Sequence, residues 1–368
     1  MTVLESLARL IDRTGVEPVA WRAPEPPSPG GVLAPNDYLD GAEQWRLPVG
    51  KGPEDVAVDH EGRVVTGGDD GKIWRFDRNG TPTQLADTRG RPLGIETLDD
   101  GRFLVCDTQR GLLRVDVSGR VDLLADTAAG SPLTACNNSA VGRDGIVYFT
   151  DSSSRFSVAD HRLDILEHSG TGRLLRFDVA TGETDVLADG LQFANGVGLA
   201  ADETHLLVAE TGAYSVSRVE LSGPDAGMRS VIAENLPGLP DNITSETASG
   251  LFWVALYSPR MKLLDMIAPY PNLRVLAANI PEKIQPSPEQ AGWVVAIDST
   301  GTVVHSLRGG RGSYAPVTGV REHGEWLYLG SLTAGAVARV PAPRRYERLP
   351  GGCRDVGDPM WKSGRATG

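Results

Sequence analysis

Short runs of strand-forming residues recur along this chain about every 40 residues, and this repeat constrains the fold more than any other feature. Six times, a two-residue turn separates a first apolar run from a second, more aromatic or aliphatic one, at Glu61-Gly62, Asp100-Gly101, Asp144-Gly145, Asp202-Glu203, Ser249-Gly250 and Gly324-Glu325. A third run follows each pair after a further turn. Such a period is typical of a β-propeller, in which each repeat forms one four-stranded blade. The sequence therefore predicts an all-β, six-bladed β-propeller rather than a β-sandwich or two all-β domains.

The ends of the repeat array predict how the ring closes. No fourth strand is evident after Val340, whereas residues 43–48 read as a strand ahead of the first repeat. We therefore expect an N-terminal strand to complete the last blade. The expected organisation is an N-terminal helix and Pro-rich leader (residues 1–34), the propeller (35–342) and an irregular C-terminal tail (343–368).

Two long insertions, residues 152–170 and 257–291, each follow the second strand of a repeat. Equivalent connections lie on the same face of a propeller, so we expect both insertions to cover the central pocket. Candidate pocket walls in the second insertion are Tyr257, Arg260, Met261 and Tyr270. In the first insertion, His161 and His168 reach the pocket only if that segment folds over it.

Four oxygen-bearing side chains hold equivalent positions at the start of an inner strand, in repeats one, three, four and five. They are Glu54, Asn137, Asn195 and Asp241. Inner strands line the axis of a propeller, so these oxygens should converge on one point. Two carboxylates and two amides suit a hard cation, and Ca2+ is the expected cofactor, with Mg2+, Mn2+ or Zn2+ as alternatives. The absence of His and Cys from the set disfavours zinc.

A single Asn-Gly or Asp-Asn pair is more often just a turn. Four such residues at equivalent positions favour a central metal site instead. Leu93 and Thr318 hold the two remaining equivalent positions and should shape the substrate pocket, together with Tyr257. Asn138 and Asn242 directly follow two of the expected ligands, and they contact either the substrate or the ligands, or only hydrogen-bond the strand starts.

Composition narrows the function classes. The net charge of -12 argues against a nucleic-acid partner, because a basic surface supplies most of that affinity. The three cysteines are widely spaced and suggest no disulfide framework, which favours a cytoplasmic location. We find no signal peptide and no run of roughly 18 apolar residues, so no membrane span is expected. A small-molecule substrate is expected, and the oligomeric state, monomer or dimer, stays open.

The chain resembles the strictosidine synthase-like branch of the calcium-dependent six-bladed propellers, over about residues 30–340. That superfamily includes gluconolactonase, regucalcin, paraoxonase and diisopropylfluorophosphatase, and the nearest likeness is to the adipocyte plasma membrane-associated proteins. The segments that carry it are Val32–Asn36, Gly90–Ile95, Ile146–Ser154, Phe193–Gly196, Val208–Thr211, Pro237–Ile243, and Glu322-His323 with Leu327–Ser331.

The resemblance implies the same four metal ligands, Glu54, Asn137, Asn195 and Asp241. It also implies differences. The catalytic glutamate of plant strictosidine synthase falls on Thr318 here, so Pictet–Spengler condensation is not expected. A histidine of paraoxonase falls on Leu93, so that enzyme's His dyad is absent.

The leading functional hypothesis is a calcium-dependent hydrolase of lactones or esters, in which the metal polarises the carbonyl. Asp241 is the expected general base or nucleophile, with Glu54 mainly a ligand. One alternative keeps the site but runs a lyase, isomerase or cyclase step in secondary metabolism. Another is a non-catalytic propeller that binds a protein or small molecule, since the fold alone cannot separate these readings.

Overall fold

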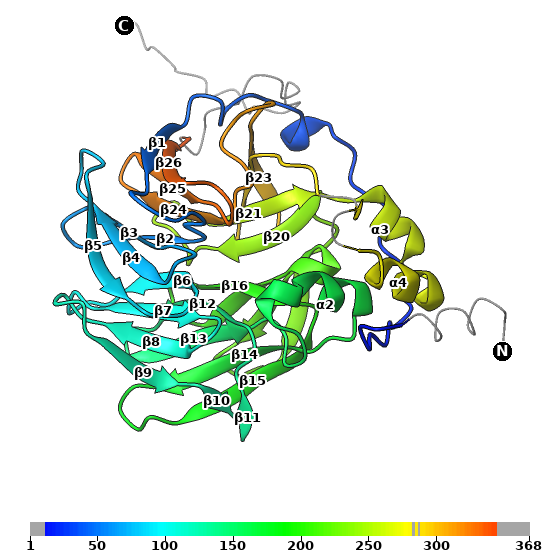
Figure 1. Ribbon diagram of the computed structural model, residues 1–368, viewed down its shortest axis with the longest axis horizontal. Coiled ribbons are helices and arrows are strands. Elements are labelled where there is room, and N and C mark those ends of the chain that lie inside the picture. The colour runs from blue at the N-terminus through cyan, green and yellow to red at the C-terminus, as the bar shows by residue number, and fades with distance from the viewer. Residues whose placement is uncertain (1–11, 282–283, 286–287, 344–368) are drawn as a thin grey trace, which may run out of the picture.

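The computed structural model describes residues 12–281, 284–285 and 288–343, and within them the chain forms six four-stranded antiparallel sheets. The sheets follow one another around the molecule in sequence order (Figure 1). Blades one and two comprise β2 (Val56–Val58), β3 (Val64–Gly67), β4 (Lys72–Phe76), β5 (Pro82–Asp87), β6 (Pro92–Thr97), β7 (Phe103–Asp107), β8 (Gly111–Val115) and β9 (Val121–Ala125). Blades three and four comprise β12 (Cys136–Val141), β13 (Ile146–Asp151), β14 (Gly172–Asp178), β15 (Thr184–Leu191), β16 (Ala194–Leu199), β17 (His205–Glu210), β18 (Ser215–Glu220) and β19 (Arg229–Ala233).

Blades five and six comprise β20 (Gly238–Ile243), β21 (Phe252–Pro259), β22 (Trp293–Ile297), β23 (Val303–Arg308), β24 (Gly319–His323), β25 (Trp326–Gly330), β26 (Ala336–Pro341) and β1 (Glu43–Arg46). The first strand of every blade contacts the first strand of the next, and β24 contacts β2, so the ring is closed. The fold predicted from the repeat, a six-bladed β-propeller, is confirmed.

The last blade joins the two ends of the propeller. Strand β1 pairs antiparallel with β26, with Glu43 opposite Arg339 and Arg46 opposite Ala336. The side chains repeat this link, because Arg339 Nε donates to Glu43 Oε2 over a separation of 296 residues. The predicted closure by an N-terminal strand is therefore confirmed.

The turn residues explain why the repeat is readable in the sequence. Each hairpin between a first and a second strand contains one residue with positive φ, namely Gly62, Gly101, Gly145, Glu203, Gly250 and Gly324. Five of the six are glycine, the residue that adopts this conformation without a steric penalty. Because turn chemistry fixes register, the alternating apolar residues of all six blades fall into equivalent places.

The core lies between neighbouring blades. The second strands β3, β7, β13, β17 and all but the first residue of β25 are buried, since each is covered on both faces by adjacent sheets. Apolar clusters connect successive blades around the ring, such as the one that joins Leu207 of β17 to Phe252 of β21. This packing holds the inner strands in fixed positions about the axis.

Both insertions are partly helical and carry η2 (Val158–Asp160), α2 (His161–Glu167), α3 (Lys262–Ile267) and α4 (Pro271–Ala278). We call these four elements the lid. They gather on one side of the ring (Figure 1). The remaining short elements are η1 (Gly31–Leu33), η3 (Thr211–Ala213) and the hairpin of β10 (Thr127–Ala128) with β11 (Ser131–Pro132). The helix predicted at the N-terminus and most of the predicted tail lie outside the described residues.

Candidate metal centre

The inner strands bulge at the predicted ligand positions. In four blades the first strand has one residue more than the matching stretch of its partner strand. These bulges lie at Pro92–Ile95, Cys136–Ser139, Ala194–Val197 and Pro240–Ile243. The first bulged residues are Leu93, Asn137, Asn195 and Asp241. Glu54 and Thr318 stand at the corresponding places, just before β2 and β24. A bulge turns a side chain away from the normal alternation, so these six residues turn out of their sheets at equivalent places.

Hydrogen bonds set the orientation of the amide ligands. Asn137 Nδ2 donates to Ser152 Oγ at 2.9 Å, and Asn195 Nδ2 donates to Thr211 Oγ1 at 3.2 Å. Since the NH2 group of each amide is held by a hydroxyl, its Oδ1 is left facing elsewhere. Asn242 Nδ2 donates to Glu54 Oε1 at 2.8 Å, which leaves Glu54 Oε2 free.

The side-chain oxygens that these hydrogen bonds do not use are buried and have no partners. Glu54 Oε2, Asn137 Oδ1, Asn195 Oδ1 and Asn242 Oδ1 have no hydrogen-bond partner among the described residues. An unpaired buried acceptor costs about 1–3 kcal/mol, so the three that belong to residues lining one cavity, on Glu54, Asn137 and Asn195, need an explanation. With Asp241 they form a set of oxygen donors suited to Ca2+, and within the described residues no cluster of three or more His, Cys, Asp or Glu competes with it. The residues fit the expected cation.

Negative charge at the centre is only partly offset, because the charge of Arg91 opposes the upward shift in the pKa of Glu54 without cancelling it. Burial, together with the nearby negative charges of Asp241 and Asp55, raises the pKa of Glu54 well above its ordinary value. Burial likewise raises the pKa of Asp241 to about 8, although a hydrogen bond from Asn195 opposes the shift. Two carboxyl groups that resist ionisation in the free protein are what a bound divalent cation would stabilise as carboxylates.

A second ring of residues directly follows the first. In blade order it reads Asp55, Gly94, Asn138, Gly196, Asn242 and Gly319, so a polar side chain alternates with glycine. The glycines are required by space: a Cβ on Gly94 would lie 2.6 Å from Cα of Asn138, and one on Gly196 would lie 2.6 Å from Cα of Asn242. Each polar residue therefore packs against the glycine of a neighbouring blade.

The polar members of this ring tie blades together. Asn138 Nδ2 donates to Asp55 Oδ2 at 3.0 Å, while its Oδ1 accepts the backbone N–H of Val197 at 3.2 Å. Thr318 also contacts the backbone of a candidate ligand, because its hydroxyl donates a hydrogen bond to the carbonyl oxygen of Glu54 at 2.7 Å. Asn138, Asn242 and Thr318 thus contact the ligand-bearing strands and do not line the central cavity.

A cavity of about 580 Å³ lies between the candidate ligands and the lid. Glu54, Asn137, Asn195 and Asp241 all line it, so the structure brings the four predicted ligands together at one cavity. Most other lining residues are apolar, and they come from the blades and the lid alike: Leu93, Phe193, Leu239, Leu332, Val158, Leu163, Leu166, Met261, Leu264, Ile267 and Ile280. The cavity therefore combines the candidate metal ligands with largely apolar walls.

Only some of the predicted wall residues line the cavity. Tyr257 and Met261 line the cavity. Arg260 does not, because its guanidinium lies over the ring of Tyr214, 4.2 Å from the centroid, and pairs with Asp265 at 3.0 Å. Tyr270 is 57% exposed and faces away from the cavity. Of the two histidines, His161 lines the cavity and His168 does not.

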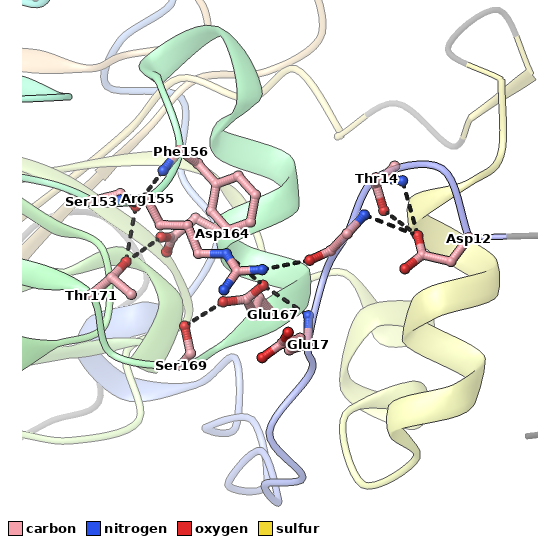
Figure 2. Close-up of polar contacts among 11 residues, drawn as sticks. Asp12, Thr14, Glu17, Ser153, Arg155, Phe156, Asp164, Glu167, Ser169 and Thr171 are labelled. Carbon is pink, nitrogen blue, oxygen red and sulfur yellow. Dashed lines mark hydrogen bonds and ion pairs between the residues drawn. The ribbon is translucent and has the colours of Figure 1, made fainter. Parts of the chain in front are cut away.

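An N-terminal segment that the sequence did not assign to the site holds the lid in place. Residues 12–25, which we call the strap, run along the lid beside α3 and α4 (Figure 1). Val19 N donates to the carbonyl of Glu167, Glu17 N donates to the Glu167 carboxylate at 2.9 Å, and Thr14 lines the cavity. Figure 2 shows Arg155 directed toward Glu167, an ion pair of 3.3 Å, beside the turn of the strap at Asp12 and Thr14.

A buried arginine joins the strap to the lid. The Arg274 side chain on α4 is fully buried and donates to the backbone carbonyls of Val19, Ala268 and Ile165. Burial lowers its pKa to about 10, opposed by the charge of Glu167. A repeat-based reading misses such residues, because strap and lid occur once and have no periodic counterpart. The apolar Val16, which packs into the cluster of Phe156 and Leu166, was the one available signal.

Comparison with known proteins agrees with this geometry. A family model described as strictosidine synthase matches residues 137–224, and one described as the N-terminal part of strictosidine synthase-like proteins matches residues 31–76. The adipocyte plasma membrane-associated protein of Rattus norvegicus is 32% identical over 357 residues, which covers 90% of this chain and 94% of that protein. The chain belongs to the strictosidine synthase-like family.

Solved structures support the fold of this strictosidine synthase-like protein. A gluconolactonase from Xanthomonas campestris superposes with a TM-score of 0.61 at 19% identity, covering 90% of this chain and all of that one. A calcium-binding protein, regucalcin from Agrobacterium tumefaciens, gives a TM-score of 0.55 at 14% identity and covers 80% of this chain and 90% of its own. At these identities the likeness establishes the shared propeller.

The predicted cytoplasmic location is wrong. Several relatives that match this strictosidine synthase-like chain over most of its length are named for association with the adipocyte plasma membrane. The prediction relied on cysteine spacing and the lack of a signal peptide, and neither observation reports on peripheral attachment. In the part of the chain that the structure describes, no helix combines the length and the apolar character needed to cross a membrane.

Proposed function

We propose that this protein is a calcium-dependent hydrolase of lactones or esters with an apolar body. The observation that carries the proposal is the set of unpartnered buried oxygens at one end of a largely apolar cavity. The gluconolactonase and regucalcin likenesses add support, since one structure is named for lactone chemistry and the other for calcium binding.

In this proposal Glu54, Asn137, Asn195 and Asp241 hold the cation, and Asn242 orients Glu54 by donating to its Oε1. The bound metal would polarise the substrate carbonyl and offset the negative charge that develops on its oxygen. The two hydroxyls that hold the amide groups, Ser152 Oγ and Thr211 Oγ1, keep the ligand oxygens oriented. Because the inner strands are fixed by packing between blades, the site is organised before substrate arrives.

The apolar walls of the cavity indicate the chemical character of the rest of the substrate. Leu93, Phe193 and Leu239 from the blades meet Leu163, Leu264 and Ile267 from the lid across the cavity. Burying an alkyl or aryl group here contributes about 25 cal/mol per Å² of apolar surface. A sugar lactone would leave many of its hydroxyl groups against these apolar walls, where they lack partners, which disfavours it. We therefore assign an apolar acyl lactone or an aryl ester to this site rather than a polyhydroxylated lactone.

The test is hydrolysis of a panel of γ- and δ-lactones and aryl esters, with calcium, with EDTA, and with Asp241→Asn. Turnover that requires calcium, favours the longer acyl chains and falls by about 100-fold or more in the variant is expected. Ser154→Ala, at an exposed position outside the cavity, is the matched control. Calcium-dependent thermal stabilisation measured on the same samples reports metal binding separately from catalysis.

Two results would redirect the assignment. Calcium binding without hydrolysis of any compound would move the search to a lyase, isomerase or cyclase reaction at the same site, or to a binding scaffold. Hydrolysis that EDTA and Asp241→Asn leave unchanged would place the chemistry away from the axis. The relatives' names also support a membrane-associated location for this protein, which fractionation of cells that express it would test.

A further inference from the structure

His161 brings the lid into the same cavity as the candidate metal ligands. It is the first residue of α2 and lines the cavity together with Glu54 and Asp241. Its neighbour Arg162 donates to the carbonyl oxygens of Ala277 and Ala278, each at 3.0 Å, and so fixes the start of α2 against the end of α4. The imidazole is therefore carried by a helix whose first turn is held in place.

The hydrogen bond of the ring defines its tautomer. His161 Nδ1 lies 2.9 Å from the carbonyl oxygen of Val158. A carbonyl oxygen only accepts, so Nδ1 carries the proton and donates it. In the neutral ring this leaves Nε2 with a lone pair and no proton. Burial lowers the pKa of His161 below its ordinary value, which keeps the ring neutral at physiological pH.

The other titratable groups around the cavity are poorly suited to accept a proton. Glu54 and Asp241 lose basicity once a cation binds them, because the positive charge lowers their pKa. Asp160 and Arg162 flank His161 on its own segment, where Asp160 already accepts the Ser157 hydroxyl at 2.8 Å. Burial raises the pKa of the Tyr257 phenol, so it stays protonated. The described cavity-lining residues of α3 and α4 are uncharged.

We infer that His161 Nε2 is the general base of the reaction, an inference that rests on the proposed hydrolase function. Nε2 takes a proton from the attacking water as the new C–O bond forms and the carbonyl π electrons move onto oxygen. When the tetrahedral species collapses, the bond from carbon to the alcohol oxygen breaks, and the protonated Nε2 returns its proton to that alkoxide. The imidazole is neutral again, and the product is a carboxylic or hydroxy acid.

The inference separates two roles that the sequence-based hypothesis gave to Asp241. In this division Asp241 holds the metal, and the lid supplies the base. The base is therefore carried by a segment that closes over the substrate, whereas the electrophilic side of the site lies on the propeller. Hydrolysis would require both the calcium-loaded ring and a correctly seated α2.

The experiment compares His161→Gln with wild type on the best lactone or ester of the panel, across pH 5 to 9 with calcium saturating. We expect kcat to fall about 100-fold with KM little changed, and the acidic limb of the kcat profile to disappear. Added imidazole should restore part of the activity of His161→Ala, because that variant leaves space for a free base. His60→Gln, an exposed histidine outside the cavity, should retain the wild-type rate.

The outcomes distinguish this inference from the proposed function. A wild type that hydrolyses with calcium while His161→Gln keeps its rate and its acidic limb overturns the role of His161 alone. A wild type without hydrolysis overturns both. Should the variants unfold, 15N NMR of histidine-labelled wild type gives an independent answer: a proton on Nε2 rather than Nδ1 of His161 at neutral pH would contradict the inference.

Discussion

Trp21 of the strap lies flat on the imidazole of His168 at the end of α2, with ring centroids 4.0 Å apart and planes inclined by 8°. Tyr214 of blade four packs against the same indole at 6.1 Å. The contact joins strap, lid and propeller through three aromatic rings. His168 is only 8% exposed, and burial, with the nearby charge of Arg274, lowers its pKa to about 3.

The first prediction follows from that buried histidine. The unfolded chain binds a proton at His168 near pH 6.5 and the folded chain only near pH 3, so protons accumulate on the unfolded state between these values. The free energy of unfolding should therefore fall as the pH drops through this window, by about 2 kcal/mol between pH 8 and pH 5 from this residue. Urea denaturation of His168→Phe, which keeps a stacked ring, should show a weaker loss. An unchanged pH dependence would contradict the prediction, and His323→Phe at an exposed position is the control.

A second prediction concerns calcium and protons. Without metal the pKa of Asp241 is raised to about 8 by burial, so at pH 6 to 7 the group is largely protonated in the free protein. A bound cation requires the carboxylate, so binding should release protons, and the calcium affinity should rise by at least about tenfold per pH unit below pH 8, because the raised pKa of Glu54 adds a second proton to be released. Calorimetry in two buffers of different ionisation enthalpy counts the protons directly. An affinity independent of pH between 6 and 8 would rule out Asp241 as a ligand that must lose a proton on binding.

A third prediction tests the alternation of glycine and polar side chains around the axis. In Gly196→Ala the new Cβ would lie 2.6 Å from Cα of Asn242 and closer still to the next backbone nitrogen, so blades four and five cannot keep their spacing. We expect a loss of about 3 kcal/mol or more of unfolding free energy, together with weaker calcium binding. Gly41→Ala, where nothing lies within 4 Å of the new carbon, should be close to neutral in thermal unfolding. Equal behaviour of the two variants would argue against close packing at the axis.

The fourth prediction separates the lid from the ring. Arg274→Met removes the donors to Val19, Ala268 and Ile165 while it keeps much of the buried side-chain volume. The strap should loosen, so that hydrogen exchange over residues 12–25 accelerates by at least about tenfold, since losing one such hydrogen bond costs about 1–3 kcal/mol. Exchange in β7 and β17 should be unchanged. Arg176→Met, whose partner Asp185 is 63% exposed, is a surface control.

The sequence allowed the ring, and the convergence of the four candidate ligands on one cavity, to be predicted because both follow from the repeat. Asn137 and Asn195 stand at equivalent bulges of successive blades, and one register rule places both. The lid could not be placed in the same way. The bond from Arg274 to Val19 spans 255 residues and has no counterpart elsewhere in the chain, so no pattern announces it.

The predictions for several residues around the site were wrong for a related reason. Arg260 and Tyr270 were expected in the pocket because they lie in an insertion that covers it. Whether such a residue faces the cavity depends on the helix rotation, and that is set by tertiary packing against the strap and blade four. Asn138 and Asn242 directly follow two candidate ligands, but their side chains hydrogen-bond Asp55 and Glu54 of blade one and do not line the cavity.

Strand β1 pairs with β26, and this pairing has a consequence for the order in which the protein can be made. The first strand of the propeller leaves the ribosome long before the strand that it must join, and Glu43 meets Arg339 only after nearly the whole ring has been synthesised. Contacts this far apart in sequence form late and slowly. Until then β1 is an unpaired edge, and the last blade lacks its fourth strand. The ring is therefore closed as a last step, after translation has passed Pro341.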